Sequence, residues 1–280
     1  MQVLIEYFET IPSSHRSLIL ISGLSFFWIL ENNISLFNFK YNKWKHAIPN
    51  LFFTLTTIII NFFLAFLLLN ISDWAISNKF GLLNRLHILP IWVNVLIGIL
   101  FLDLIGAYLP HWLEHKIKPL WMIHLVHHSD HHVDTTTANR HHPLESIIRF
   151  IFTLLGVLII GANIGIVMLY QSISLISTQF NHANIKLPKN VDLFLSYFFV
   201  SPDMHKTHHH YRLPYTDSNF GNIFSIWDRF FGTYKALRRE KLIYGVDVFF
   251  DEDANGKISH LLKQPFQPYS KPTLPAQSKD

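Results

Sequence analysis

Long apolar stretches without charged residues occupy the first part of the chain and predict membrane helices. Leu18–Leu30 and Ile48–Ile71 carry no charge, and Leu89–Leu109 carries only Asp103. A hydrocarbon core of about 30 Å is crossed by about 20 helical residues, so the second and third stretches are long enough to span it and the first is short. Polar residues 31–33 end the first stretch, and no pattern of small residues for cleavage by a signal peptidase follows it. We therefore interpret it as a retained membrane helix and not as a signal peptide.

A fourth apolar region, Ile147–Phe180, is charged only at Arg149. As one helix it would be about 51 Å long, which exceeds a single untilted crossing. Gly161, Asn163 and Gly165 at its middle are typical of a turn. We expect a membrane hairpin over residues 147–180 that enters and leaves by the same side. The alternative is one long, tilted helix.

Half of the residues are hydrophobic, and the formal net charge is +4. The loop after the first apolar stretch carries three lysines, Lys40, Lys43 and Lys45, whereas the next loop has Lys79 and Arg85 offset by Asp73. Cytoplasmic loops carry the excess of basic residues, so we expect the first loop to be cytoplasmic and the chain to return to that side at Pro110. The basic residues lie mostly in such loops and in the tail, and we expect no nucleic-acid partner.

Three short histidine clusters follow the apolar stretches. They are His111-x-x-x-His115, His124-x-x-His127-His128 and His205-x-x-His208-His209. Spacings of three and four residues place side chains on one face of a helix, where imidazoles can converge on a metal. Eight neutral imidazoles are too many for one tetrahedral zinc ion and favour a site for two metal ions.

Three other residues are candidates for this site. His182 directly follows the expected hairpin and could supply a ninth ligand. His142 could bind metal or donate a hydrogen bond to a ligand. Asp103 belongs to a four-residue repeat with His111 and His115, so it could support the site or form the floor of a cavity. The alternative for Asp103 is an acid near the interface that pairs with a neighbouring helix. Some histidines have no spacing argument of their own: His131, His132, His141 and His210.

The chain contains no cysteine. This excludes disulfides, thiolate metal ligands and iron-sulfur clusters held by cysteine. It also contains no Gly-x-Gly-x-x-Gly loop for a nucleotide cofactor. An oxidation reaction on this chain would therefore need electrons from outside it.

The pattern predicts an all-α fold, an integral membrane helical bundle with a histidine-rich helical cap on the cytoplasmic side. We expect three regions. Residues 1–88 form N-terminal membrane helices, residues 89–235 hold the histidines and the hairpin, and residues 236–280 form a solvated tail. The tail is charged and then proline-rich from Pro265 to Pro275, which is typical of partial disorder.

Four ordered motifs between roughly residues 90 and 235 resemble the sterol desaturase and fatty acid hydroxylase superfamily. The residues that carry the resemblance are Tyr108-x-x-His111-x-x-x-His115, Leu120-Trp121-x-x-His124-x-x-His127-His128-Ser129-Asp130, Thr136-x-x-x-Arg140-x-His142-Pro143-x-Glu145, and His205-x-x-His208-His209 through Asn219-Phe220-Gly221 to Trp227-Asp228-Arg229-x-Phe231-Gly232-Thr233. Trp112 departs from the pattern, since many members have arginine after the first histidine.

The resemblance implies a multi-pass membrane oxygenase that uses two iron ions and dioxygen to hydroxylate or desaturate a lipid C–H bond. The histidines would be metal ligands, and the resemblance assigns no further catalytic residue. An external reductase or electron carrier would supply the electrons. The expected ligands are His111, His115, His124, His127, His128, His182, His205, His208 and His209.

Two functions of other classes remain open from the sequence. A membrane metal transporter also uses helices and histidines, but transporters place their ligands near the bilayer midplane. A membrane zinc hydrolase needs three ligands and usually a carboxylate base. Glu114 lies next to His115, but the His-Glu-x-x-His order of such enzymes is absent. The sequence does not choose among sterol, acyl, ether or carotenoid substrates.

Overall fold

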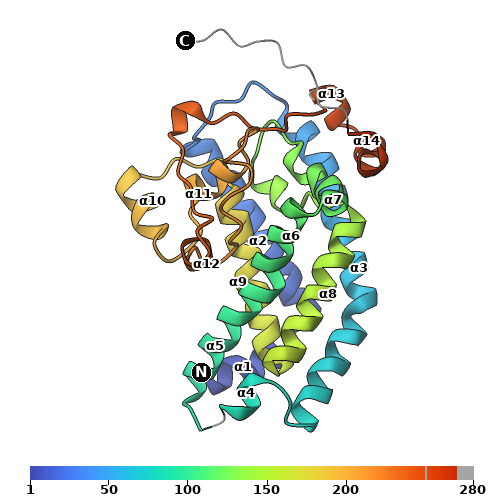
Figure 1. Ribbon diagram of the computed structural model, residues 1–280, viewed down its shortest axis with the longest axis vertical. Coiled ribbons are helices and arrows are strands. Elements are labelled where there is room, and N and C mark those ends of the chain that lie inside the picture. Colours follow the sequence, from blue (N-terminus) through green and yellow to red (C-terminus); the bar gives the residue numbers. More distant parts are fainter. Residues whose placement is uncertain (87, 250, 270–280) are drawn as a thin grey trace.

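The chain folds into a bundle of helices with a smaller helical cap at one end (Figure 1). The computed structural model describes residues 1–86, 88–249 and 251–269, and within these ranges it has isolated β-bridges but no strand. The bundle consists of α1 (Gln2–Glu9), α2 (Ser13–Asn33), α3 (Lys43–Ser77), α4 (Leu82–Arg85), α5 (Ile91–Asp103), η1 (Leu104–Tyr108), α6 (Leu109–Lys116), α8 (Pro143–Ile160) and α9 (Ile164–His182).

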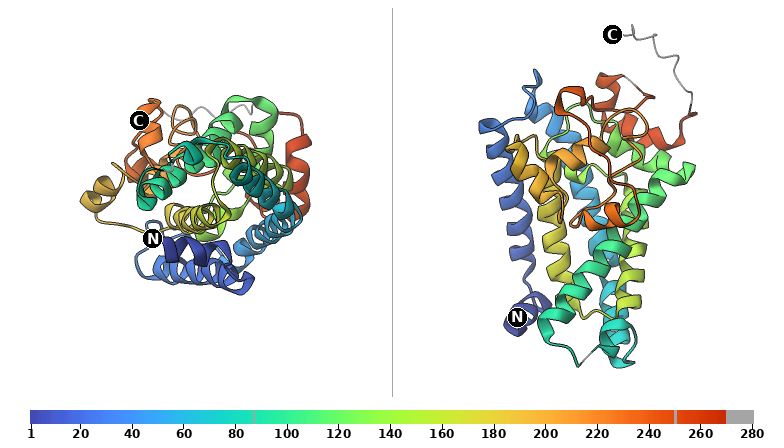
Figure 2. Two further views of the ribbon diagram at one scale, coloured as in Figure 1. Left: turned by 90° about the horizontal axis from the view of Figure 1, so that it is seen from below. Right: turned by 60° about the vertical axis from the view of Figure 1, so that its left-hand side comes forward.

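Shorter elements form the cap. They are α7 (Lys118–His128), η2 (Thr135–Asn139), α10 (Lys189–Leu195), α11 (Pro202–His208), α12 (Ile226–Phe230), η3 (Arg239–Lys241), α13 (Glu252–Asn255), α14 (Ile258–Lys263) and η4 (Gln264–Phe266). In the bundle, α9 packs against α1, α2 and α5, while α8 packs against α3 and α5. The end-on view in Figure 2 shows this arrangement.

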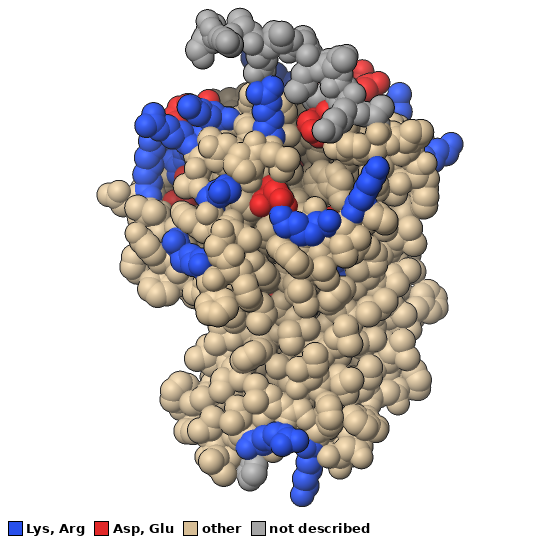
Figure 3. Space-filling view, in the orientation of Figure 1, with Lys and Arg blue, Asp and Glu red and all other residues tan. Residues whose placement is uncertain are grey.

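Three segments are long and apolar enough to cross a membrane. They are Lys43–Arg85, Ile91–Lys116 and Pro143–Ile160. On the face shown in Figure 3, lysines and arginines lie on the cap and at the opposite end, and a broad band between them has no charged side chain. Such a band matches the hydrocarbon layer of a bilayer. The fold is thus an all-α membrane bundle, and α2 and α9 pack within it although they are more polar.

The Ile91–Lys116 membrane segment is one continuous helix that contains a π-helical turn. In η1 the Leu109 N–H bonds to the carbonyl of Leu104, five residues earlier, where an α-helix would use a spacing of four. Pro110 follows directly and lacks an N–H. A π turn widens a helix by one residue and is common at functional sites. Here it lies between Asp103 and His111.

The fourth apolar region forms two helices, α8 and α9, joined by a turn, and not one long tilted helix. Gly161 adopts the left-handed conformation with φ of 69°, and the Asn163 side chain accepts a hydrogen bond from the N–H of Ile166 at 2.9 Å to start α9. A Cβ atom on Gly161 would lie 2.2 Å from the carbonyl oxygen of Phe80. The turn therefore needs glycine for both its conformation and its close packing. It returns the chain to the cap, where the third histidine cluster follows.

The last described segment differs from the solvated tail that the composition predicts for residues 236–280. Leu261 on α14 is fully buried against Phe53 and Val126. Arg140, also buried, donates a hydrogen bond to the carbonyl of Asn255 at 2.8 Å. Scattered apolar residues in this segment have no clear period, so their packing on α3 and α7 is not visible in the sequence. The end of the proline-rich stretch, from residue 270, lies outside the described residues.

Candidate metal centre

Four helices bring histidines to the junction of bundle and cap. α6 carries His111 and His115, and α7 carries the second cluster. α11 with the residue after it carries the third, and His182 is the last residue of α9. Proline at the start of α7 and α11 fits the first turn of each helix, where its missing N–H needs no partner. The second and third clusters therefore lie on short helices with defined starts.

The nine histidines form two adjacent groups. Within each group, one ring nitrogen of every histidine lies within 4.8 Å of the corresponding nitrogens of the other members. The five-histidine group contains His111, His115, His124, His128 and His208. The four-histidine group contains His127, His182, His205 and His209. The rings of His128 and His209, one from each group, stack with centroids 4.7 Å apart. Each group could hold a metal ion, so the arrangement has room for a pair.

The hydrogen bonds of His111 and His208 leave their Nε2 atoms available to bind a cation. His111 donates its Nδ1 proton to the carbonyl of Phe220 at 2.8 Å, and His208 donates its Nδ1 proton to the carbonyl of Ser218 at 2.6 Å. A neutral imidazole has one proton, so each Nε2 atom keeps only a lone pair. These Nε2 atoms lie 2.9 Å apart and would repel each other. A metal ion bound by both lone pairs would remove this repulsion.

The four-histidine group has the same character. His182 donates its Nδ1 proton toward the carbonyl of Thr178 and the side-chain oxygen of Asn181, at 2.8 and 2.7 Å. Its Nε2 atom lies 2.9 Å from Nε2 of His205 and 3.1 Å from Nε2 of His127. Nε2 atoms thus converge on one point in this group as well.

The histidines of the cap are held in the neutral form that metal binding requires. Burial lowers the pKa of the His124 imidazole to about 4, although the neighbouring Glu145 carboxylate opposes this shift. Burial, reinforced by the other imidazoles of the two groups, also lowers five further pKa values well below the ordinary histidine value: those of His127, His128, His205, His208 and His209.

A buried carboxylate network orients the second cluster. Glu145 Oε1 accepts hydrogen bonds from Nδ1 of His124 at 2.8 Å, from Nδ1 of His141 at 2.7 Å and from Nε of Arg149 at 3.0 Å. Arg149 also donates to Glu114 at 2.6 Å. A carboxylate behind a metal-binding histidine fixes its ring and raises its basicity. His124 therefore presents Nε2 to the five-histidine group.

One loop, residues 218–228, supports the third cluster and His111 together. Asp228 accepts from the backbone N–H groups of Phe220 and Gly221, at 2.8 and 2.9 Å, and thereby fixes the carbonyl that His111 contacts. Asp103 accepts from the N–H groups of Ile223 and Phe224, both at 3.2 Å. These contacts connect the Ile91–Lys116 membrane segment to the loop.

The structure does not bring Asp103 or His142 into either histidine group. Asp103 contacts the loop, with the indole of Trp227 as a third donor at 3.1 Å. His142 begins α8, where its Nδ1 accepts from the N–H of Leu144 at 3.2 Å. Neither residue is therefore proposed as a metal ligand.

His141 contributes to the site although its spacing gave no reason to select it. Its ring stacks on that of His127 with centroids 4.8 Å apart, and it bonds to Glu145. The separation of four residues between His141 and Glu145, just before an apolar helix, is the signal that could have found this pair.

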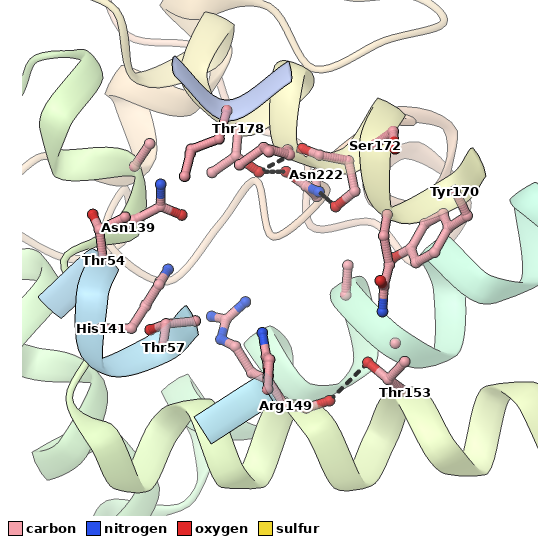
Figure 4. Close-up of a pocket in the computed structure, with 18 of the residues that line it drawn as sticks. Thr54, Thr57, Asn139, His141, Arg149, Thr153, Tyr170, Ser172, Thr178 and Asn222 are labelled. Carbon is pink, nitrogen blue, oxygen red and sulfur yellow. Dashed lines mark hydrogen bonds between the residues drawn. The ribbon is translucent and has the colours of Figure 1, made fainter. Parts of the chain in front are cut away.

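Two cavities reach the histidines from opposite sides. The larger, of about 360 Å³, lies among α2, α3, α8 and α9 and touches His111 of the five-histidine group and His127, His182 and His205 of the four-histidine group. Figure 4 shows the side chains around it. A smaller cavity of about 230 Å³ reaches His115 from the cap, beside Trp121 and Tyr269. The metal centre can therefore be approached both from the membrane bundle and from the cap.

Comparison with known proteins gives one family and several relatives. The family model described as fatty acid hydroxylase matches residues 95–233. The chain is 26% identical to methylsterol monooxygenase 2-2 of Arabidopsis thaliana over 82% of its own length and 86% of that protein. It is 24% identical to an ornithine lipid hydroxylase of Rhizobium tropici over 65% of its length, and 33% identical to alkylglycerol monooxygenase of Danio rerio over 50% of its length.

Coverage of these relatives differs. The matched part makes up 52% of the ornithine lipid hydroxylase and 30% of the alkylglycerol monooxygenase, so the chain spans about half or less of those two proteins. No solved structure matches the chain. All nine histidines of the two groups lie within the residues that the family model matches.

Proposed function

We propose that this chain, which belongs to the sterol desaturase and fatty acid hydroxylase superfamily, is a membrane oxygenase that uses dioxygen to oxidise a C–H bond of a lipid. The relatives are lipid monooxygenases and hydroxylases, which supports an oxidoreductase acting on lipids. Whether this chain hydroxylates or desaturates depends on how the substrate is placed.

One observation carries the proposal: two adjacent all-histidine groups stand at the end of a cavity inside a membrane bundle. Imidazole suits iron, and the absence of thiolates fits a centre that binds dioxygen and not an iron-sulfur cluster. We assign one iron ion to the five-histidine group and one to the four-histidine group. When bound, the pair would supply the redox chemistry that activates dioxygen.

The protein side chains hold and shield this centre. Glu145 keeps the Nδ1 proton on His124, and the carbonyls of Phe220 and Ser218 do the same for His111 and His208. Eight of the nine histidine side chains are buried, so water is kept from the metal-facing nitrogens. The bundle cavity gives a lipid access without passage through water.

Electrons would come from an external reductase or electron carrier on the cap side, which we assign to the cytoplasm. Trp121 supports this route because its ring lies 4.8 Å from that of His115 and 5.4 Å from that of His128. It also lines the smaller cavity. Electron delivery and substrate access would then use opposite sides of the centre.

The decisive experiment measures iron in the purified protein. Protein expressed with labelled iron should contain about two iron ions per chain with a coupled Mössbauer signal. His128→Ala and His208→Ala should both lose that signal, whereas His15→Ala, a change at an exposed histidine outside both groups, should keep it. An iron-free protein after anaerobic, iron-replete purification would overturn the proposal.

A second measurement tests the reaction. With a chemical reductant and dioxygen, lipids extracted from the host should gain one oxygen atom or lose two hydrogen atoms, as mass spectrometry would show. No lipid change by an iron-loaded protein would separate a metal-binding role from an oxygenase.

A further inference from the structure

The larger cavity has two polar stripes on opposite walls. One stripe, on α3, consists of Thr54, Thr57 and Asn61. The other, on α9, consists of Gln171, Ser174 and Thr178. Both sets have spacings of three and four residues, so each lies on one face of its helix. Figure 4 shows Thr54 and Thr57 across the open space from Thr178. Polar residues inside a membrane bundle are retained where they face a cavity or a partner.

The threonine hydroxyls have partners within the protein, but two amides do not. Thr54 donates to the carbonyl of Asn50 at 2.9 Å, and Thr178 donates to the carbonyl of Ser174 at 2.8 Å. In the described part of the chain, the side-chain amides of Asn61, an exposed residue, and Gln171, which is half-buried, form no hydrogen bond. Each amide has two N–H donors, and leaving them unpaired in an apolar environment is unfavourable. A bound molecule would satisfy them.

Both amides lie at the end of the cavity away from the histidines. Gln171 precedes His182 by eleven residues on α9, which is about 16 Å along the helix. Asn61 follows Asn50 by eleven residues on α3, and Asn50 contacts Thr136 in the cap. The two amides therefore have similar depth in the bundle, although they belong to different helices.

Arg16 is a third donor at this end. It lies on α2, lines the same cavity and is exposed, and its side chain bonds to Ser13 at 3.0 Å. Gln179 donates to the carbonyl of Leu20, one helical turn above Arg16. Arg16 is thus near the depth of Gln171. The other arginine of the cavity, Arg149, is already paired with two carboxylates.

We propose that Arg16, Asn61 and Gln171 form a subsite for the polar end of the lipid substrate, and that this end carries hydrogen-bond acceptor oxygens. All three side chains can donate, so a carboxylate, ester or amide carbonyl fits, whereas a pure hydrocarbon leaves them unpaired. The reacting carbon lies about 16 Å away, at the histidines. This inference rests on the proposed function in taking the cavity as the substrate site.

Equilibrium binding to the full-length, iron-loaded chain under anaerobic conditions tests this subsite without turnover. We expect labelled hexadecanoic acid and its methyl ester to bind and hexadecane to compete with neither. Asn61→Leu with Gln171→Leu should weaken binding about tenfold. Arg16→Gln should weaken the acid more than the ester, which separates an anionic from a neutral acceptor. Asn70→Leu should change nothing, because Asn70 is an exposed amide on α3 that already bonds to the carbonyl of Phe66.

Equal binding of the acid, the ester and hexadecane would overturn the subsite. So would unchanged acid and ester binding by the double variant, provided that it keeps the iron content and unfolding temperature of the wild type. Either result leaves the proposed function standing, since iron content and lipid oxidation are measured separately. An iron-free wild type would instead overturn the proposed function, and binding to that protein would still test the subsite.

Discussion

The atom that each histidine presents to the centre is set by the contact on the other side of its ring. His111 and His208 rely on backbone carbonyls of the 218–228 loop, and His124 relies on the Glu145 carboxylate. The carbonyls keep the ring neutral and oriented, and the carboxylate also raises its basicity. The three contacts differ in charge, so their loss should have different consequences.

Replacing Glu145 by glutamine should weaken metal binding about 10- to 100-fold, as is typical when a partner behind a metal-binding histidine is lost. Glutamine keeps the shape but removes the negative charge that faces His124, His141 and Arg149. Competition with a chelator measures the affinity. Glu240→Gln, an exposed glutamate on the cap, is the matched control, and equal affinities for both variants would contradict the role of Glu145.

Acidification should release the metal. The folded pKa of His124 is about 4, below the ordinary histidine value of 6.5. Between these values the unfolded chain binds a proton that the folded chain does not, so stability falls as the pH drops from about 6.5 toward 4. Protons also compete with metal for the same nitrogen atoms. Iron content after dialysis should be retained at about pH 7.5 and reduced at about pH 5; full retention at pH 4.5 would contradict this prediction.

At the scale of helices, the sequence predicted the elements better than their contacts. Long uncharged stretches identify α3 and the helix from α5 to α6 because membrane helices follow from length and polarity alone. The contacts of Asp103 with the 218–228 loop and the stacking of His141 on His127 are tertiary, and spacing along the chain does not encode them. The polar stripes of α3 and α9 were not predicted, and it is the cavity that shows that they face each other.

Gly161→Ala should destabilise the protein more than Gly232→Ala. Both glycines have left-handed φ values, 69° and 71°, so alanine costs about 1 to 2 kcal/mol at either position. Only at Gly161 does the new Cβ also meet another atom, the Phe80 carbonyl oxygen at 2.2 Å, whereas nothing lies within 4 Å at Gly232. Thermal unfolding in detergent measures the difference. Equal losses would mean that the α8–α9 turn does not pack on Phe80.

For the whole molecule, the cap and the opposite end of the bundle should lie on different sides of the membrane. Basic residues gather at both ends of the face in Figure 3, with an uncharged band between them. The chain also lacks cysteine, so one introduced cysteine is a unique label. The orientation of the entire bundle can therefore be read from two positions.

A membrane-impermeant maleimide should label Glu240→Cys and Arg85→Cys from opposite sides. Both side chains are exposed, one on the cap and the other at the end of α4. With the cap in the cytoplasm, intact cells should label only Arg85→Cys, and permeabilised cells should label both. The wild type provides an unlabelled background. Labelling of both variants from one side would contradict a spanning bundle.

The loop that joins Asp103 to the third histidine cluster also sets an order of assembly. Asp103 and the first two clusters leave the ribosome more than 60 residues before His205, and the backbone groups that Asp103 binds come later still, at Ile223 and Phe224. During synthesis, Asp103 in the Ile91–Lys116 segment therefore lacks these backbone partners, and neither histidine group is complete. Under the proposed function, metal loading would be among the last steps of biogenesis, after the membrane helices are inserted. A chain that stops before residue 205 would be inserted but would lack both complete metal sites.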